Sequence, residues 1–281
     1  MSELSVVILT YNEEENIAQA LESVCGWADK VVVLDSFSTD KTVEIASTYP
    51  CEIFTNRFKG YADQRNHSIK NLGVDSEWML FLDADEWVSA EAKEEIKKLI
   101  SKVPKENGFY IKRRFIWMGK WIRRGYYPTW LLRLFRTHKS HCESRLVNEH
   151  IVVDGDIGFL QNDIIHDDQK GISEWINRQN KFATLEMEEL FKNRNNKDEN
   201  LNVTFFGTQA ERKRWLREKI WNKLPPLIRP FFYFHYRYFV RGGFLDGKEA
   251  FIYHFLQGLW LPFLIDVKYL MKKKQVKSEK K

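Results

Sequence analysis

The sequence predicts an α/β protein: a mostly parallel sheet with helices on both faces, followed by a helical C-terminal appendage. Two observations carry this prediction. In the first hundred of the 281 residues, short hydrophobic runs alternate with amphipathic segments, which is typical of parallel strands joined by helices. From residue 201 onward, aromatic and basic residues fill segments of helical length.

Four strands are expected in the first part of the chain. Residues 4–10 (LSVVILT), 30–35 (KVVVLD) and 78–82 (WMLFL) are nearly continuous apolar runs, which indicates strands buried on both faces. Residues 51–55 form a shorter run. Sheets of this kind bind ligands at the carboxyl ends of their strands, so polar residues at those ends are the first candidates for a site.

Helices are expected between these strands. Asn12 is expected to cap the first helix, with Glu13, Glu14 and Glu15 in its first turn. Two further helices are expected over residues 38–48 and 61–72. The apolar faces of the first helix and of residues 89–102 repeat at helical spacing. Their expected inner residues are Ile17, Ala20, Leu21, Val24, Ala92, Ile96, Leu99 and Ile100.

A change of pattern after residue 105 predicts a second part of the chain. Antiparallel strands and turns are expected over residues 108–117, 130–136, 151–153 and 157–160, and helices over residues 171–194, 211–223, 227–241 and 246–274. The polar segment 193–202 indicates a loop or linker. We therefore expect one domain over residues 1–200, itself divided at residue 105, and an appendage over residues 201–281.

Charge and aromatic residues are unevenly distributed. Residues 1–200 carry 27 basic and 33 acidic side chains, whereas residues 201–281 carry 17 and 6 together with 18 of the 41 aromatic rings. A nucleic-acid-binding surface, a helical appendage packed on the domain and helices lying on an anionic membrane all fit such a segment. Its dense aromatic runs contain no recognised RNA-binding motif, so nucleic acid is disfavoured and a membrane surface is favoured.

Several classes of protein are disfavoured by the sequence. The longest apolar run, residues 251–265, is interrupted by polar residues and a proline, and it falls short of the ~20 residues that a spanning helix needs. The chain begins with Met-Ser-Glu and enters a strand directly, so no signal peptide is expected. Three cysteines without CxxC spacing predict reduced thiols rather than disulfides or a zinc site. Together these features indicate a cytoplasmic protein, and they predict no particular oligomeric state.

An acidic motif follows the fourth expected strand. Asp83 and Asp85 lie two residues apart, directly after the apolar run. Carboxylates placed in this way can share a Mg²⁺ or Mn²⁺ ion with substrate phosphates, since these ions prefer oxygen ligands. A solvated acidic turn is the alternative for the motif alone. Asp35, after the second strand, either accepts hydrogen bonds from a ribose or base or caps the next helix.

These motifs together resemble the family 2 glycosyltransferases. The matching segments, in order, are SVVILTYNEEENI, VVVLDSFSTDKT, Gln64-Arg65-Asn66 and FLDADE. The resemblance implies the GT-A fold, a Rossmann-like mixed sheet, and an inverting enzyme with a nucleotide-sugar donor. It is strongest over residues 4–105, which would be the nucleotide-binding part of the domain, and residues 106–200 would form the acceptor-side part.

A narrower resemblance is to the bacterial subgroup typified by lipopolysaccharide-core β-glucosyltransferases. The segments that carry it are WLLRLFR (130–136), VNEH (147–150), IH (165–166) and RGGFLDG (241–247). It implies a UDP-sugar donor, with UDP-glucose favoured, and a hydroxyl of a cell-surface glycan or glycolipid as acceptor. Such an acceptor implies a peripheral position on the inner face of the cytoplasmic membrane.

The family pattern implies a donor site. Thr10, Tyr11 and Glu13 would line the nucleoside pocket, and Asp35 would hold the base. Arg65 would lie near the nucleotide or its phosphates.

The same pattern implies a metal site and a catalytic base. Asp83 would contact the ribose or the metal, Asp85 would coordinate the metal, and His166 either completes the metal site or is an ordinary buried histidine. Inversion requires a carboxylate beside the acceptor hydroxyl. Glu149 is our candidate, although the subgroup usually shows His-Glu where this chain has Asn148-Glu149.

An acceptor cleft is expected from a second cluster of arginines and aromatic residues, represented by Trp121 and Arg133. Core aromatics with solvated charges are the alternative. Two other functions remain open. A sugar nucleotidyltransferase would normally carry a glycine-rich phosphate loop after the first strand, which residues 10–13 do not provide. A non-catalytic glycan-binding or scaffold protein would leave the acidic pair idle.

Overall fold

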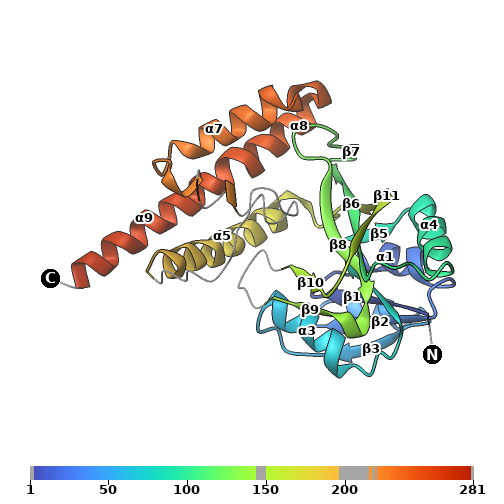
Figure 1. Cartoon of the computed structure of the whole chain (residues 1–281). Coiled ribbons are helices and arrows are strands. Elements are labelled where there is room, and N and C mark those ends of the chain that lie inside the picture. The colour runs from blue at the N-terminus through green and yellow to red at the C-terminus, as the bar shows by residue number, and fades with distance from the viewer. Residues whose placement is uncertain (1–2, 144–149, 196–214, 217–218, 220, 280–281) are drawn as a thin grey trace. The chain divides into compact units, whose positions relative to one another are not determined.

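The computed structural model describes residues 3–143, 150–195, 215–216, 219 and 221–279 (Figure 1). The chain forms two compact units. The first unit comprises Met1–Trp121 and Tyr127–Gly171, and the second unit comprises Ile122–Tyr126 and Ile172–Lys281. The domain boundary expected after residue 200 lies outside the described residues and stays a prediction.

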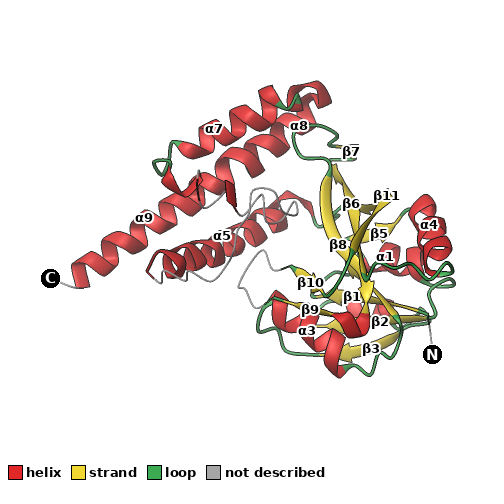
Figure 2. Ribbon diagram, viewed as in Figure 1, coloured by secondary structure: helices red, strands yellow, loops and turns green. Residues whose placement is uncertain are grey.

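A nine-stranded mixed sheet forms the centre of the first unit (Figure 2). The strand order is β3-β2-β1-β4-β8-β6-β11-β5, with β7 paired to β6 and a separate β9–β10 pair. The strands are β1 (Leu4–Thr10), β2 (Lys30–Asp35), β3 (Glu52–Thr55), β4 (Trp78–Asp83), β5 (Glu86–Val88), β6 (Gly108–Trp117), β7 (Lys120–Trp121), β8 (Thr129–Arg136), β9 (Ser140–Cys142), β10 (Ile151–Val153) and β11 (Ile157–His166). The expected mixed sheet is confirmed. Parallel pairing joins β3, β2, β1 and β4 and also β6 with β11, whereas β8, β5 and β7 pair antiparallel with their neighbours, so the sheet is not mostly parallel.

The ends of three parallel strands meet at one edge of this sheet. β1 pairs in parallel with β2 on one side and with β4 on the other, in a register that sets Thr10 opposite Asp35 and Leu9 opposite Asp83. The polar residues that follow these strands are therefore neighbours, as the strand pattern predicts.

Helices cover both faces of the sheet because successive strand residues point to opposite sides. Val6 and Ile8 of β1 pack in one core with residues of α1 (Ile17–Val24), α2 (Thr42–Ala46) and α4 (Ala90–Ile100). Val7 packs in the other core with Met79 and with Leu72, which follows α3 (Tyr61–Asn71). The inner faces predicted for α1 and α4 are confirmed, apart from Leu99, which is only partly buried.

Two local expectations for the first unit are wrong. The first helix begins at Ile17, not after Asn12, because Asn12 has a left-handed φ of 52° and its side-chain oxygen accepts the Thr39 N–H at 2.8 Å. β11 runs parallel to β6, not antiparallel, and extends to His166. The two- and three-residue strands β5, β7 and β9 are too short for a periodic signal and were not expected.

The second unit is helical in its described residues. Its helices are α5 (Gly171–Asn195), α7 (Arg229–His235), α8 (Gly247–His254) and α9 (Leu261–Glu279), with π-helical turns at Tyr236–Val240 and Phe255–Trp260 and short 3₁₀ turns at Trp221–Lys223 and Gly243–Asp246. A further 3₁₀ turn, Thr137–Lys139, lies in the first unit. Met187 and Leu190 of α5 pack on Tyr269 of α9, which joins the long helix to the C-terminal one.

Gly243–Glu279 forms one helical stretch of 37 residues with a window of mean hydropathy 1.3. By length and composition this stretch is sufficient to cross a membrane, so the expectation that no segment qualifies is corrected. The polar residues and the proline were expected to end the apolar segment. Instead, the helical stretch continues past His254, Gln257 and Pro262, from α8 through the π-helical turn into α9.

Candidate active site

A cluster of carboxylates and guanidinium groups lies where β4 ends. Arg133 Nη2 of β8 lies 2.5 Å from Asp83 Oδ2, and Arg65 Nη2 of α3 lies 3.4 Å from Asp83 Oδ1. Burial alone would raise the pKa of Asp83, but Arg133 and Arg65 outweigh it and hold that pKa well below its usual range. Asp83 is therefore a permanent anion at neutral pH.

Glu86, the fourth residue of the acidic motif, is the inner member of this cluster. It is fully buried, it pairs with Arg133 at 2.9 Å and with Arg113 at 3.4 Å, and its carboxylate accepts the Asp83 N–H at 3.1 Å. Three guanidinium groups thus face two carboxylates. The cationic excess suits a ligand that carries phosphates, since guanidinium forks bind phosphate oxygens well.

Asp85 faces a histidine rather than an arginine. His166 Nδ1 lies 3.2 Å from Asp85 Oδ1, and the imidazole stacks on Phe115 with 4.9 Å between ring centroids. Burial lowers the pKa of His166, but the Asp85 carboxylate outweighs it, so the pKa lies above the ordinary histidine value. β11 and β5 bring the pair together, because His166 is opposite Glu86 in their register.

The Asp85–His166 pair fits a divalent cation that also binds phosphates. In the described part of the chain, no group of three or more His, Cys, Asp or Glu side chains forms a complete metal cage. Mg²⁺ rarely has such a cage, because it usually binds through one or two carboxylates together with substrate phosphates and water. The Nδ1 of His166 faces the Asp85 carboxylate, and imidazole nitrogen is a common metal ligand, so both side chains could hold the same ion.

Two loops close the β1 and β2 ends of the sheet and hold each other by side-chain hydrogen bonds. The Asn12 N–H donates to Ser38 Oγ at 2.8 Å, and the Glu13 N–H donates to Thr42 Oγ1 at 2.7 Å. The buried Asp35 carboxylate accepts the Ser38 N–H at 2.9 Å. Asp35 thus holds the loop at Ser38 and does not cap the next helix, since α2 begins at Thr42; its expected contact with the ribose or base stays a prediction.

The predicted nucleoside residues lie around these loops. Thr10 and Asp35 are buried and opposite each other in the sheet, whereas Tyr11 is exposed. Glu13 is buried, and its carboxylate accepts hydrogen bonds from Lys170 and, at 2.7 Å, from Asn16. Burial and the Asp85 charge raise the pKa of Glu13 despite Lys170.

α3 is tied to the sheet next to Arg65. The Gln64 amide donates to Ser36 Oγ at 2.7 Å and accepts from Asn56 Nδ2 at 2.7 Å. These bonds join the helix to the segments after β2 and β3. Arg65, the next residue, is therefore held toward Asp83.

The expected arginine and aromatic cluster does not form as one cluster. Arg133 is buried against Asp83 and Glu86, and Arg136 pairs with Glu77 at another position. Arg124 belongs to the second unit and pairs with Asp246 at 2.7 Å. The Arg114 guanidinium lies over the Trp121 ring, with 4.4 Å between the guanidinium carbon and the ring centroid.

Glu149, the candidate base, lies outside the described residues. The strand that leads toward it is held to α3. The Cys142 N–H donates to Asn66 Oδ1 at 2.9 Å, and Asn66 Nδ2 donates to the Cys142 carbonyl at 2.8 Å.

Three contributors to this site, Asn16, Glu86 and Lys170, were not predicted, and Arg113 was expected in the arginine and aromatic cluster, not beside Glu86. Glu86 follows Asp85 directly, so a third acid at a strand end was its only signal. Arg113 lies 27 residues from its partner Glu86 in the sequence, and Lys170 lies 157 residues from Glu13. The contact of Asn16 with Asp168 spans 152 residues. Such long-range contacts leave no local signal.

The mixed sheet with its acidic strand edge defines a GT-A domain. Residues 5–161 match the sequence profile of Glycosyl transferase family 2. The chain belongs to this family.

The chain is also similar to individual proteins. An uncharacterized glycosyltransferase of Rickettsia typhi is 27% identical over 261 residues, covering 88% of this chain and 82% of its own. Glycosyltransferase SunS of Bacillus phage SPbeta is 39% identical over 95 residues, covering 33% of this chain and 22% of its own. Among solved structures, S. aureus TarS 1-349 in complex with UDP-GlcNAc has a TM-score of 0.46 and 15% identity, covering 96% of this chain and 92% of that one.

Proposed function

We propose that the chain is a metal-dependent, inverting glycosyltransferase that moves a sugar from a UDP-sugar to a hydroxyl of a glycan or glycolipid. The observation that carries this proposal is the pairing at the end of β4. Asp83 is held by Arg133 and Arg65, and Asp85 lies 3.2 Å from His166. An anionic metal ligand beside a cationic excess is the arrangement that a metal-bound diphosphate requires.

The donor would bind across the ends of β1, β2 and β4. Tyr11 is exposed at this edge and would cover the base, with Thr10, Glu13 and Asp35 forming the floor. Asp35 is already occupied by Ser38, so a nucleoside would add hydrogen bonds to a preformed loop. Arg65, tied down through its neighbour Gln64, would face the phosphates.

Mg²⁺ or Mn²⁺ would be held by Asp85 and His166, and Asp83 would contact the ribose or the ion. The ion supplies positive charge for the leaving diphosphate. Arg133 has a different role here from the acceptor contact expected for it. Because it is buried between Asp83 and Glu86, we propose that it positions Asp83.

Glu149 would accept the proton of the acceptor hydroxyl. The freed oxygen would form the new bond to the anomeric carbon while the bond from that carbon to the diphosphate breaks. The electron pair leaves with UDP, and attack from the opposite face inverts the anomeric centre. Trp121 is retained as the candidate acceptor contact, supported by its position beside Arg114 and Tyr127.

The favoured donor sugar is glucose and the favoured acceptor is lipopolysaccharide core or a related bacterial surface glycan. Both follow from the subgroup resemblance of residues 130–136, 147–150 and 241–247. An acceptor linked to lipid would require the enzyme at the inner face of the cytoplasmic membrane, where UDP-sugars are available.

The proposal is tested by incubating the full chain with a panel of nucleotide sugars, Mn²⁺ and a lipopolysaccharide-core acceptor. We expect UDP release from UDP-glucose that depends on the metal and increases with acceptor. Pyrophosphate formation from a nucleoside triphosphate and a sugar phosphate would instead identify a nucleotidyltransferase. Binding of glycan without turnover of any donor would identify a binding module.

A further inference from the structure

The second unit buries several charged residues, among them Arg229, Arg237 and Asp266, and exposes many aromatic ones. A protein folded in water normally shows the reverse, because burial of apolar side chains stabilises it and burial of charge does not. Contiguous exposed apolar surface marks a docking or membrane site. The two features together indicate that this unit folds against an apolar surrounding.

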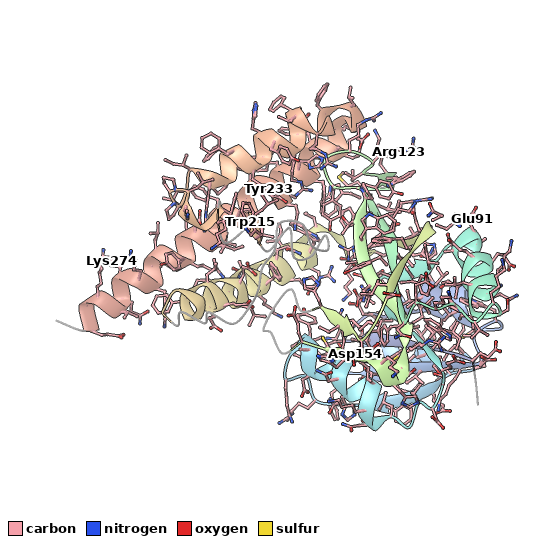
Figure 3. The ribbon with its side chains drawn as sticks, viewed as in Figure 1. Glu91, Arg123, Asp154, Trp215, Tyr233 and Lys274 are labelled. Carbon is pink, nitrogen blue, oxygen red and sulfur yellow. The ribbon has the colours of Figure 1, made fainter. Side chains whose placement is uncertain are left out.

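Exposed apolar side chains, most of them aromatic, are spread along α7, α8 and α9 and the turns between them, and these helices form one hairpin. Phe231 and Phe232 are 55% and 61% exposed. Figure 3 shows the side chains of this hairpin, with Tyr233 and Lys274 labelled. We call this surface the aromatic face. Its exposed members are Ile228, Phe231, Phe232, Tyr233, Tyr236, Phe239, Val240, Phe244, Leu245, Phe251, Phe255, Phe263, Leu270 and Met271.

A buried ion pair lies inside the hairpin. Arg229 of α7 and Asp266 of α9 are 3% and 0% exposed and are paired through two guanidinium nitrogens. Asp266 also accepts the Leu227 N–H at 2.9 Å. The carboxylate thus joins the start of α7 to the middle of α9.

A second polar cluster fixes the other end of the hairpin to residues 122–126. Asp246 accepts both the backbone N–H and a guanidinium N–H of Arg124 at 2.7 Å. His254 is fully buried, and its Nε2–H donates to the Arg124 carbonyl at 3.2 Å. The two glycines around it have no room for a side chain, since a Cβ at Gly125 or Gly243 would lie 2.6 Å from the His254 ring.

Basic residues surround the aromatic face. The exposed cations of the hairpin are Arg241, Lys248, Lys272, Lys273, Lys274 and Lys277. Helices with aromatic residues on one face and Lys or Arg around it bind at the interface of anionic bilayers. Charge complementarity therefore favours an anionic lipid surface over a second copy of this cationic unit.

We infer that the α7–α9 hairpin lies in the plane of an anionic bilayer interface, with its aromatic face among the acyl chains and both of its ends on the same side. This inference specifies how the enzyme of the proposed function would bind the membrane. It rests on the proposed function only in taking the acceptor to be linked to lipid. The partner is the lipid surface itself.

Two features disfavour a spanning arrangement, although Gly243–Glu279 is long enough. A spanning α9 would carry Asp266, and with it Arg229, toward the bilayer centre, where charged groups are costly. The other feature is the attachment of α8 to residues 122–126, which continue directly into β7 and Tyr127. The chain on either side of this segment belongs to the first unit, so this end of the hairpin is connected on both sides to the domain outside the bilayer.

Vesicle flotation of the full chain tests the docking surface. Vesicles of phosphatidylcholine with phosphatidylglycerol should bind the chain, and phosphatidylcholine alone should bind it more weakly. Combining Phe231→Ser, Phe232→Ser and Phe239→Ser should weaken binding at least tenfold. Phe159→Ser is the matched control, because Phe159 is 54% exposed on β11 of the first unit, and it should bind like the parent.

Unchanged binding of the triple variant, with retained helix content, would overturn the inference. So would a chain that ignores anionic vesicles and buries these rings in a stable dimer. Donor and metal are absent from the assay, so its outcome is independent of glycosyl transfer.

Side-specific labelling separates a surface hairpin from a spanning helix. Ser278→Cys should react with a membrane-impermeant maleimide only after spheroplasts are permeabilised, with the parent chain supplying the background of the native cysteines. Labelling in intact spheroplasts would place α9 across the membrane and contradict the inference.

Discussion

Charged side chains have opposite settings in the two units. In the first unit they gather at one edge of the sheet, where Asp85 and His166 pair near solvent-facing loops and three guanidinium groups face two carboxylates. In the second unit Arg229 and Asp266 are sealed between helices whose outer surface is aromatic. The same residue types therefore form the proposed ligand site in one unit and pair helices in the other.

The largest expected effect is the loss of the Asp85 carboxylate. Asp85→Ala should reduce sugar transfer by on the order of a thousandfold or more, because the leaving diphosphate loses its metal-borne charge stabilisation. The melting temperature should change little. Initial-rate assays of UDP release measure the effect, with the exposed Asp75→Ala as control. An Asp85→Ala enzyme with most of the parent rate would contradict the role of the acidic edge.

The second unit should respond in the opposite way. Asp266→Asn leaves Arg229 buried and unpaired, which costs about 3–5 kcal/mol. Denaturant unfolding in detergent should show the hairpin melting earlier, whereas UDP binding to the first unit should persist. If UDP binding were lost along with helix content, the fold of the first unit would depend on the hairpin, which contradicts the separate roles of the two units.

A pH effect distinguishes the units further. Burial, followed by the Arg237 charge, lowers the pKa of His254 to about 4 from an ordinary value of 6.5. The unfolded chain therefore binds the proton more tightly than the folded one between these values, and the second unit loses stability as pH falls. The expected loss is about 2 kcal/mol at about pH 5 relative to about pH 8.

Denaturant unfolding at the two pH values measures this loss. His254→Gln is the comparison, because it removes the titrating group and should flatten the dependence. A parent chain whose second unit is equally stable at both pH values would refute the buried neutral state of His254.

The smallest expected effect is on the stability of the first unit, at a helix cap away from the candidate active site. Ser89 caps α4 by accepting the Ala92 N–H at 3.2 Å. Ser89→Ala should lower the free energy of unfolding by about 1 kcal/mol and leave UDP release unchanged. Ser101→Ala, at the exposed end of the same helix, should change neither, and thermal melting checks both.

Much of the first unit is predictable because its signals are local. The runs at residues 4–10, 30–35 and 78–82 form buried parallel strands, and the residues that follow them, Asp35 and Asp83 among them, meet at one edge. The alternation with helices predicts the parallel pairing of β1 to β4, but not their order in the sheet. The parallel pairing of β11 with β6 was not predicted. It depends on a long-range connection between the two strands, and the local sequence pattern does not show which strands pair.

The roles of Arg133 and of the second unit were less predictable. Arg133 lies in a run of arginines and aromatics that indicated an acceptor surface, and only the pairing of β8 with β4 brings it to Asp83. In the second unit, periodicity predicts helices but not which face is buried. The polar side chains of Arg237, His254 and Asp266, which lie on three different helical segments, would be expected to face water. In the structure all three are buried.

Calorimetric titration of UDP tests the central claim most directly, because it requires no knowledge of the sugar or acceptor. In the parent chain, Mn²⁺ should strengthen UDP binding by at least tenfold, since Asp85 and His166 would hold an ion that supplies positive charge for the diphosphate. In Asp85→Ala, UDP should bind weakly and equally with and without Mn²⁺. Equal affinity in the parent with and without the ion, or an undiminished effect of the ion in Asp85→Ala, would contradict the account.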